Sequence, residues 1–210
     1  RCGYKYGYQM KETLINKQLL RIKMRRERQN LSTQQQQLAS ENLLKNLHLL
    51  SSFNESQHIA MYLAADGEID PLHIIDYCWA HGKAVYLPVL DPDKHNQLLF
   101  VHYTADTKMG VNKYQIAEPS APYQQVKPAQ ELDLVLFPLV AFDQQGHRMG
   151  MGGGYYDRSF EFKHCDANTK DSKPMLVGLA HEIQKVENLA IESWDIALSN
   201  IITDQAIYTA

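Results

Sequence analysis

A ten-residue segment, DLVLFPLVAF (133–142), constrains the fold of this chain more than any other part of it. After the opening aspartate no residue is polar, so both faces of an extended strand would be apolar. A strand of an antiparallel sheet commonly has one face in water. A strand that is apolar on both faces is typical of a parallel sheet covered by helices on both sides. The segment therefore predicts a central strand of an α/β fold.

A second segment predicts how neighbouring strands are connected. The β-type runs HIAMYLA (58–64) and KAVYLPVL (83–90) flank a helix that Asp70-Pro71 opens and Gly82 ends. A strand, helix and strand in this order form a βαβ unit, with two parallel strands and a right-handed crossover. Further strands are expected at 98–103, 175–181 and 197–203, and a helix at 155–162.

We therefore expect a single three-layer α/β/α domain with a largely parallel sheet. The chain has 210 residues, without an internal repeat or a linker-like stretch. The domain is expected to cover residues 11–210, with residues 1–10 as an N-terminal leader or an expression remnant. A net charge of −3 predicts no nucleic-acid partner, and no apolar run reaches membrane-spanning length. Three scattered cysteines without disulfide or metal-ligand spacing favour a cytoplasmic location.

The N-terminal region predicts two helices, of which the first has an apolar and a basic face. Over Lys11–Gln29, apolar residues recur at helical spacing and are expected to pack inward: Ile15, Leu19 and Ile22. Basic residues recur along another side: Lys17, Arg21, Arg25 and Arg28. Such a stripe is most simply explained as a solvated face. Ser32 and Gln35 have the spacing of a capping box for a second helix that ends near Leu50.

A glycine-rich stretch, GHRMGMGGGYYDR (146–158), follows the expected central strand. It has neither the GK[ST] ending of a Walker A motif nor a GxGxxG fingerprint. Glycines let backbone N–H groups approach an anion, and a following helix adds its dipole. The Arg148 guanidinium can bind two phosphate oxygens at once, and the Asp157 carboxylate is a suitable ligand for Mg²⁺. The simpler alternative is a tight turn whose glycines relieve steric strain. In either case, an arginine in a glycine loop is expected outside the core.

Three segments resemble one enzyme family, in the same order along the chain. FDQQGHRMGMGGGYYDR (142–158) resembles the motif FDxxGxRLGxGxGYYDR of the 5-formyltetrahydrofolate cyclo-ligases, also called 5,10-methenyltetrahydrofolate synthetases. KQLLRIKMRRERQNLS (17–32) is similar to the family's opening Lys–x3–Arg helix and the R–x2–LS after it. MYLAADGEID (61–70) is similar to the segment that contains a folate-binding glutamate. The resemblance extends over about Asn16–Thr203.

The resemblance implies a ligase that uses ATP and Mg²⁺ to convert 5-formyltetrahydrofolate, with or without a polyglutamate tail, to 5,10-methenyltetrahydrofolate. ATP would phosphorylate the formyl oxygen, N10 would attack the activated carbon, and phosphate would leave. Because N10 belongs to the same molecule, the substrate supplies proximity, and no Ser–His or Cys–His nucleophile is needed. The family's fold is similar to that of sugar-phosphate isomerases and CoA-transferases. A monomer is expected.

The resemblance also implies roles for individual residues. Lys17 and Arg21 match a pair that contacts ATP, whereas Arg25 and Arg28 are left to the solvated face. The ATP loop matches Arg148, Met149, Gly150, Met151, Gly152, Gly153, Gly154, Tyr155 and Tyr156, with Arg148 and Tyr155 as candidate catalytic residues. Substrate contacts match Leu63, Glu68, Met151, Gly152, Gly153, Gly154 and Tyr155. Metal ligands are expected at Asp157 and, because the family's second carboxylate falls at Ser199, at Asp195. Without the resemblance, Glu68 is an ordinary turn residue and Leu63 a core residue.

Some features depart from the family or leave other functions open. Several members carry basic residues at the positions of Met151 and Gly153, so this chain is expected to bind a polyglutamate tail less tightly. Another ATP-using enzyme of the same fold group is one alternative. A nucleotide- or RNA-binding module that uses the basic stripe is another, although the net negative charge and the lack of aromatics between the basic residues argue against it. The nine histidines lack HExxH or similar spacing, so no catalytic transition metal is expected.

Overall fold

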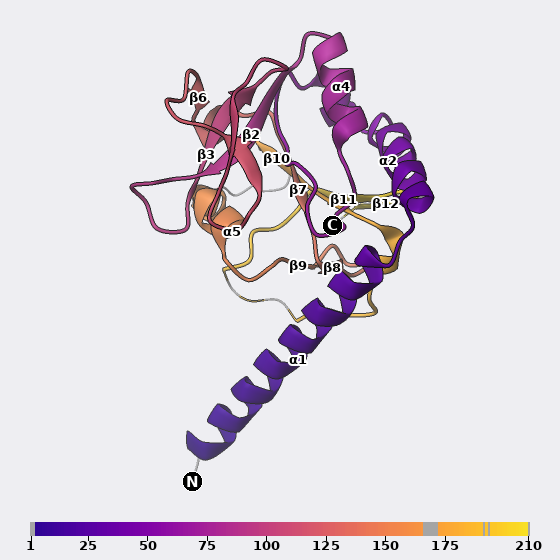
Figure 1. Ribbon diagram of the computed structural model, residues 1–210. Helices are drawn as coiled ribbons and strands as arrows, with labels where there is room; N and C mark the ends of the chain where they lie inside the picture. The colour runs from indigo at the N-terminus through magenta and orange to yellow at the C-terminus, as the bar shows by residue number, and fades with distance from the viewer. Residues whose placement is uncertain (1–2, 166–171, 191, 193, 210) are drawn as a thin grey trace.

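The computed structural model describes residues 3–165, 172–190, 192 and 194–209, which are organised around an eight-stranded sheet (Figure 1). In spatial order the strands are β12 (Ile207–Thr209), β11 (Asn200–Thr203), β10 (Met175–Ala180), β7 (Leu134–Pro138), β1 (His58–Ala60), β2 (Ala84–Leu90), β3 (Leu98–Tyr103) and β6 (Val126–Lys127). The strands from β11 to β2 run parallel, and the outer pairs are antiparallel. The expected α/β class with a largely parallel sheet is confirmed.

Strand β7 is the central strand that the apolar segment predicts. It pairs in parallel with β1 on one side and with β10 on the other. Its side chains alternate between the two cores of the molecule. Leu134 and Leu136 belong to one core, and Val135 and Phe137 belong to the other. Each of the four is at most 2% exposed, so both faces of the sheet are covered at its centre.

The helices cover the two faces of the sheet unequally (Figure 1). One face carries α2 (Thr33–Leu47), α3 (Ser51–Glu55) and α4 (Leu72–Ala80), which bury Leu43, Phe53 and Ile74 in the first core. The other face carries the short helix α5 (Tyr155–Ser159) and the 3-10 turn η2 (Glu161–Cys165), with Phe160 in the second core. Two further 3-10 turns are η1 (Ala129–Glu131) and η3 (Glu182–Gln184). The second helical layer is therefore thin.

Local sequence signals place the first elements of the sheet as expected. Strands β1 and β2 are parallel neighbours joined through α4. Asp70 Oδ1 accepts a hydrogen bond from Leu72 N at 3.0 Å, and Gly82, at φ +69°, follows the end of α4. The capping box of α2 is present: Ser32 Oγ accepts from Gln35 N, and Gln35 Oε1 accepts from Ser32 N. Helix α2 ends at Leu47, three residues before the expected end.

The inward face of the first helix differs from the prediction. Helix α1 runs over Gly3–Gln29 rather than beginning at Lys11, and its N-terminal part projects from the body (Figure 1). Leu19 and Ile22, which were expected to be buried, are 58% and 60% exposed; the side chain of Ile15 lies outside the described residues. The face that contacts the body carries Met24, at 4% exposed, and Arg28, at 1%. Met24 packs in a small apolar cluster with Ala141 and Met149, and Arg28 contacts polar groups of a turn, so the predicted apolar face is not the one that docks.

Several short elements carry no sequence signal of their own. Two hairpins stand outside the main sheet, β4 (Met109–Val111) with β5 (Ala117–Pro119) and β8 (Ala141–Phe142) with β9 (Arg148–Met149). Strands of two or three residues are too short for a recognisable alternation of polar and apolar side chains. In the part of the chain that the structure describes, no helix is both long enough and apolar enough to cross a membrane.

Candidate functional site

The glycine loop, residues 150–154, leaves β9 and leads into α5. Gly152 and Gly154 have φ angles of +92° and +66°, which side chains other than glycine adopt rarely. Two backbone positions of the loop therefore favour glycine, which both the anion site and the tight turn predict. Helix α5 is only five residues long and does not extend to residue 162 as predicted. An anion at this loop would depend on loop N–H groups and nearby cations more than on a helix dipole.

Arg21 is the residue that approaches the glycine backbone most directly. Its Nε donates a hydrogen bond to the Gly150 carbonyl at 2.9 Å. At Gly152, an added Cβ atom would lie 3.4 Å from Cζ of the same guanidinium, so a larger residue would crowd it. The structure thus brings together two segments that are 129 residues apart in the sequence, the basic helix and the glycine loop. Both were expected to contact ATP.

Lys17 lies one turn earlier on α1, at a cavity of about 250 Å³. Leu20, Met149 and Leu189 also line this cavity. The Lys17 ammonium forms an ion pair with Glu192 Oε1 at 2.6 Å, and the two side chains are 17% and 38% exposed. Glu192 is thus the anionic partner of Lys17 in this structure.

Arg148 is not a peripheral residue, and the expectation that it lies outside the core is wrong. Its side chain is 11% exposed, and its guanidinium lies over the Phe137 ring, 5.3 Å from the centroid. One amino group donates to Asp157 Oδ1 at 2.5 Å, and the other donates to the Ile196 carbonyl. Burial lowers the pKa of Arg148, while Asp157 and Asp195 raise it. The arginine sits on β9, so its side chain is positioned by a hairpin rather than by a free loop.

Both candidate metal ligands interact with this arginine, Asp157 directly and Asp195 electrostatically. Asp157 Oδ1 accepts a hydrogen bond from Arg148 and another, at 3.4 Å, from the backbone N–H of Ile196. Asp195 Oδ2 accepts from the Glu192 N–H at 2.8 Å. Among the described residues, no group of three or more histidine, cysteine or acidic side chains could hold a metal ion. Two carboxylates are nevertheless enough for Mg²⁺, which commonly takes its other ligands from water and nucleotide phosphates.

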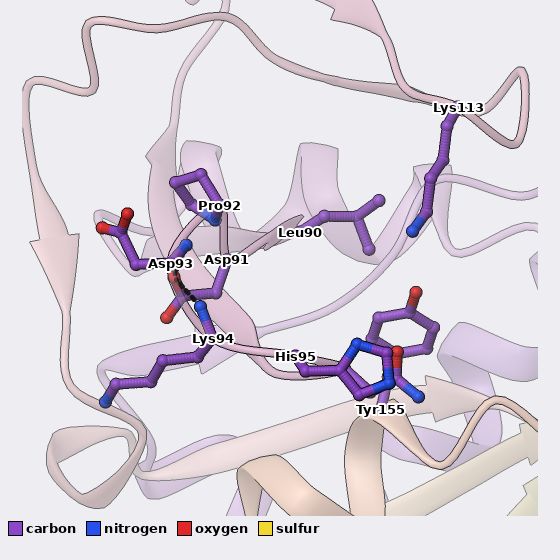
Figure 2. A pocket seen from close by; sticks show the side chains of 9 residues that line it. Leu90, Asp91, Pro92, Asp93, Lys94, His95, Lys113 and Tyr155 are labelled. Carbon is purple, nitrogen blue, oxygen red and sulfur yellow. Dashed lines mark hydrogen bonds between the residues drawn. The ribbon is translucent and has the colours of Figure 1, made fainter.

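Tyr155 faces a second cavity, of about 360 Å³, together with residues that the sequence analysis missed. Its hydroxyl lies 2.8 Å from the hydroxyl of Tyr114, and Asn96 Nδ2 donates to the Gly153 carbonyl at 3.0 Å. In Figure 2, Lys113 reaches toward the ring of Tyr155. Tyr114, Asn96 and Lys113 lie in turns without a periodic pattern. The one sequence signal for them is Tyr114, an aromatic residue in a polar segment.

Glu68 lies in the turn after β1, largely buried, with 14% of its side chain exposed. Its Oε2 accepts from the Ala65 N–H at 3.1 Å, and its Oε1 lies 3.7 Å from Nη2 of Arg28. Burial raises the pKa of Glu68 to about 7, and Arg28 acts in the opposite direction. Leu63, nearby, packs against the first core, in keeping with the simpler interpretation of that residue.

Tyr156 connects the glycine loop to the surroundings of Glu68. Its ring stacks on Phe137, with centroids 4.8 Å apart. Burial raises the pKa of the Tyr156 phenol, and the Glu68 carboxylate raises it further. The loop and the turn are therefore within electrostatic range of each other. In contrast, Met151 at the tip of the loop is 54% exposed and does not belong to this buried group.

The basic stripe of α1 is not a free surface. Arg25 Nε and Nη2 donate to the two oxygens of Asp66, at 2.6 and 3.1 Å. Arg28 is buried and also donates to Asp66. The assignment to a solvated face is wrong for Arg28, which is buried, whereas the Arg25 side chain is 40% exposed and shares the single charge of Asp66 with Arg28. This weakens the surface on which a nucleic-acid-binding module would have depended.

Comparison with known proteins supports one family. The model of the 5-formyltetrahydrofolate cyclo-ligase family matches residues 14–204. The chain is 40% identical over 186 residues to a 5-formyltetrahydrofolate cyclo-ligase of Haemophilus influenzae, covering 89% of this chain and 96% of that one. It is 36% identical over 185 residues to the corresponding protein of Escherichia coli strain K12, covering 88% and 98%.

Two solved structures are also similar. The NMR structure of Aquifex aeolicus 5,10-methenyltetrahydrofolate synthetase has a TM-score of 0.75 and 29% identity, with 92% of each chain covered. A 5,10-methenyltetrahydrofolate synthetase from Mycoplasma pneumoniae has a TM-score of 0.67 at 23% identity, covering 90% of this chain and 98% of that one, and it supports the fold alone.

Proposed function

This chain belongs to the 5-formyltetrahydrofolate cyclo-ligase family, whose members use ATP to cyclise 5-formyltetrahydrofolate, and we propose that its own reaction takes place between the glycine loop and the Glu68 turn. The observation that carries the proposal is the hydrogen bond from Arg21 to the Gly150 carbonyl, with the Arg21 guanidinium also close to Gly152. It joins the two segments expected to bind ATP, although nothing in their separate sequences requires them to meet.

The ATP phosphates would bind across Lys17, Arg21 and the glycine loop. Lys17 would exchange Glu192 for a phosphate oxygen, which replaces one anionic partner with another. The N–H groups of residues 150–154 would point at the triphosphate, since the glycines leave no Cβ in the way. Arg148 and Tyr155 would face the transferring phosphoryl group, where Arg148 stabilises charge that develops in the transition state.

The carboxylates beside Arg148 suit Mg²⁺ as the partner of these phosphates. Both contacts of Asp157 use Oδ1, so a metal would bind through Oδ2, and Asp195 would be the second protein ligand. When bound, Mg²⁺ would neutralise phosphate charge as ADP leaves. The protein's own residues would position the two substrates and exclude water.

The folate would bind with its pterin at Glu68 and its formyl group toward the glycine loop. The carboxylate of Glu68 would accept hydrogen bonds from pterin N–H groups, and Leu63 and residues 151–155 would form the wall of the pocket. The formyl oxygen attacks the γ-phosphorus and ADP leaves. N10 then attacks the activated carbon, the carbon–oxygen bond breaks, and N10 loses its proton as phosphate departs. That the protein is a monomer, and that it accepts polyglutamylated folate, both stay predictions.

The function is tested by turnover of the purified protein. We expect 5-formyltetrahydrofolate with MgATP to give the methenyl chromophore, with one ADP released for each product. Omission of ATP, Mg²⁺ or folate should each abolish the signal. ADP release without a methenyl product, or methenyl formation without ATP, would show that the assignment is wrong. A gel shift with a salt titration covers the nucleic-acid alternative, for which a steep salt dependence without folate turnover is expected.

A further inference from the structure

One carboxylate makes several of the contacts between helix α1 and the turn that carries Glu68. Asp66 accepts hydrogen bonds from three residues in the last two turns of the helix: Arg25, Arg28 and Gln29. Asp66 itself adopts a left-handed conformation, with φ +54°, which a non-glycine residue adopts rarely. The turn is thus fastened in a specific geometry to the helix that also carries Lys17 and Arg21.

Arg28 is the centre of this junction. It is 1% exposed, although an arginine is seldom fully buried without partners. Its Nε donates to the Asp66 carbonyl at 2.8 Å, its Nη1 to the Leu139 carbonyl at 3.2 Å, and its Nη2 to Asp66 Oδ2 at 2.8 Å. One side chain therefore links α1, the turn after β1 and the segment after β7.

The backbone of the turn also lies directly on the end of α1. Gly67 has φ +73°, and an added Cβ atom there would lie 3.0 Å from the Arg28 carbonyl oxygen. That oxygen also accepts a hydrogen bond from Gln36 Nε2, which in addition donates to the Gly67 carbonyl. Neither the turn nor the helix end can move without breaking contacts with the other.

Glu68 is the next residue along this turn, and its carboxylate meets the guanidinium of Arg28 at 3.7 Å. The charged and titratable groups around it come from four parts of the chain: Arg25 and Arg28 on α1, Tyr62 and Asp66 in the segment after β1, Tyr156 on α5, and His181 after β10. His181 lies close to Arg28 and Gly67. Arg28 is the positive group in direct contact with the carboxylate.

We propose that Arg28 is a positioning residue for folate binding, which orients Glu68 and favours its ionised form while it fixes the turn to the ATP-binding helix. The inference rests on the proposed role of Glu68 toward the pterin. It goes beyond that role because it assigns a function in the reaction to a buried residue that touches neither substrate. It also explains why an arginine is buried here, where an apolar residue would pack at less electrostatic cost.

The charges around Glu68 predict that two substitutions at the junction change its pKa in opposite directions. Burial raises the pKa of Glu68 to about 7, Arg28 lowers it, and Asp66 raises it. Loss of the Arg28 charge should therefore move the Glu68 pKa upward. Loss of the Asp66 charge should move it downward, although both substitutions disrupt the same junction. A purely structural junction would give changes in one direction.

The test is the pH profile of KM for 5-formyltetrahydrofolate in three variants. Arg28→Gln should raise this KM about tenfold at pH 7, with kcat less affected, and should shift the profile to higher pH. Arg28→Lys keeps the positive charge but not the planar guanidinium. It should recover much of the wild-type pH profile of this KM. Asp66→Asn should shift it to lower pH. Arg26→Gln, an exposed arginine on the same helix, is the matched control and should match the wild type.

The outcomes separate this inference from the proposed function. A wild-type protein without turnover would overturn the function itself. An active wild type, with Arg28→Gln and Asp66→Asn profiles that are unmoved or shifted in the same direction, would overturn the role of Arg28 alone. If Arg28→Gln does not fold, Arg28→Lys and Asp66→Asn decide, because lysine keeps the positive charge and asparagine keeps the size of the side chain it replaces, while each gives up part of the hydrogen bonding of the junction. Circular dichroism and melting temperature are recorded for each variant.

Discussion

The glycine loop and the Asp66–Glu68 turn contribute to the same proposed site, but they are stabilised in different ways. The loop is exposed at residues 150–153, and single hydrogen bonds from Arg21 and Asn96 reach its carbonyls. The turn is fixed by a buried arginine, a shared carboxylate and close backbone contact. Phosphates change charge and partner during the reaction, whereas the pterin N–H groups proposed to contact Glu68 form and break no bond in it. An adaptable loop suits the first substrate and a fixed turn suits the second.

Arg148 gives the strongest test of this difference between the two regions, because it belongs to the loop side and yet is largely buried. Arg148→Ala should lower kcat by about 10²-fold or more, the scale on which a transition-state donor is lost. It should also lower the free energy of unfolding by about 2 kcal/mol, because Asp157 loses its partner in a partly buried site. Steady-state kinetics and denaturant unfolding measure the two effects.

Arg158→Ala is the matched control for this variant. Arg158 is an exposed arginine one residue after Asp157, and its loss should leave both quantities near the wild-type values. A folded Arg148→Ala variant with unchanged kcat would remove Arg148 from the reaction. A loss of stability without any further loss of kcat would make it structural only.

A smaller effect is expected at the carboxylates of the loop side. Asp157→Asn keeps the shape of the side chain but removes its charge, so the Mg²⁺ concentration for half-maximal activity should rise about tenfold. Asp195→Asn should raise it by a similar or smaller factor. Titration of Mg²⁺ at saturating ATP and folate checks both. If neither titration moves, the metal is bound by ATP and water alone.

The smallest effect concerns the stability of the turn side as pH changes. The pKa of Glu68 is raised from 4.5 to about 7, so between these values the folded protein binds a proton that the unfolded chain has released. The free energy of unfolding should therefore fall, on the order of 2 kcal/mol, as pH rises from about 4.5 to about 7. Glu68→Gln should lack this component. Denaturant unfolding at several pH values would contradict the account if both proteins changed in parallel.

The sequence predicted those parts of the molecule that depend on local patterns. The central strand, the βαβ unit and the capping box all arise from residues that are close together in the chain. The face of α1 could not be predicted in this way, because Arg28 is buried through an aspartate about forty residues away. Apolar periodicity assumes that a helix docks with apolar residues alone, and α1 docks with Met24 in a small apolar cluster and with Arg28, whose partners lie in a turn.

The site was predictable only in part, for the same reason. Motif spacing identified Arg21, the glycine loop and Glu68, which the structure brings into one region. The burial of Arg148 was missed because the β8–β9 hairpin has strands of two residues. Lys113, Tyr114 and Asn96 were missed because they lie in turns, and their proximity to Tyr155 depends on the packing of three separate segments.

The central claim, that the loop side serves ATP and the turn side serves folate, is tested most directly by crossed kinetics of Lys17→Ala and Glu68→Gln. Lys17→Ala should raise the KM for ATP and leave the KM for folate nearly unchanged. Glu68→Gln should do the reverse, since an amide accepts fewer pterin N–H bonds than a carboxylate. Each lost contact to a charged group is worth about 1.5–3 kcal/mol, or roughly one to two decades in KM. If both variants weakened ATP alone, or if neither changed either KM, the division between the two regions would be contradicted.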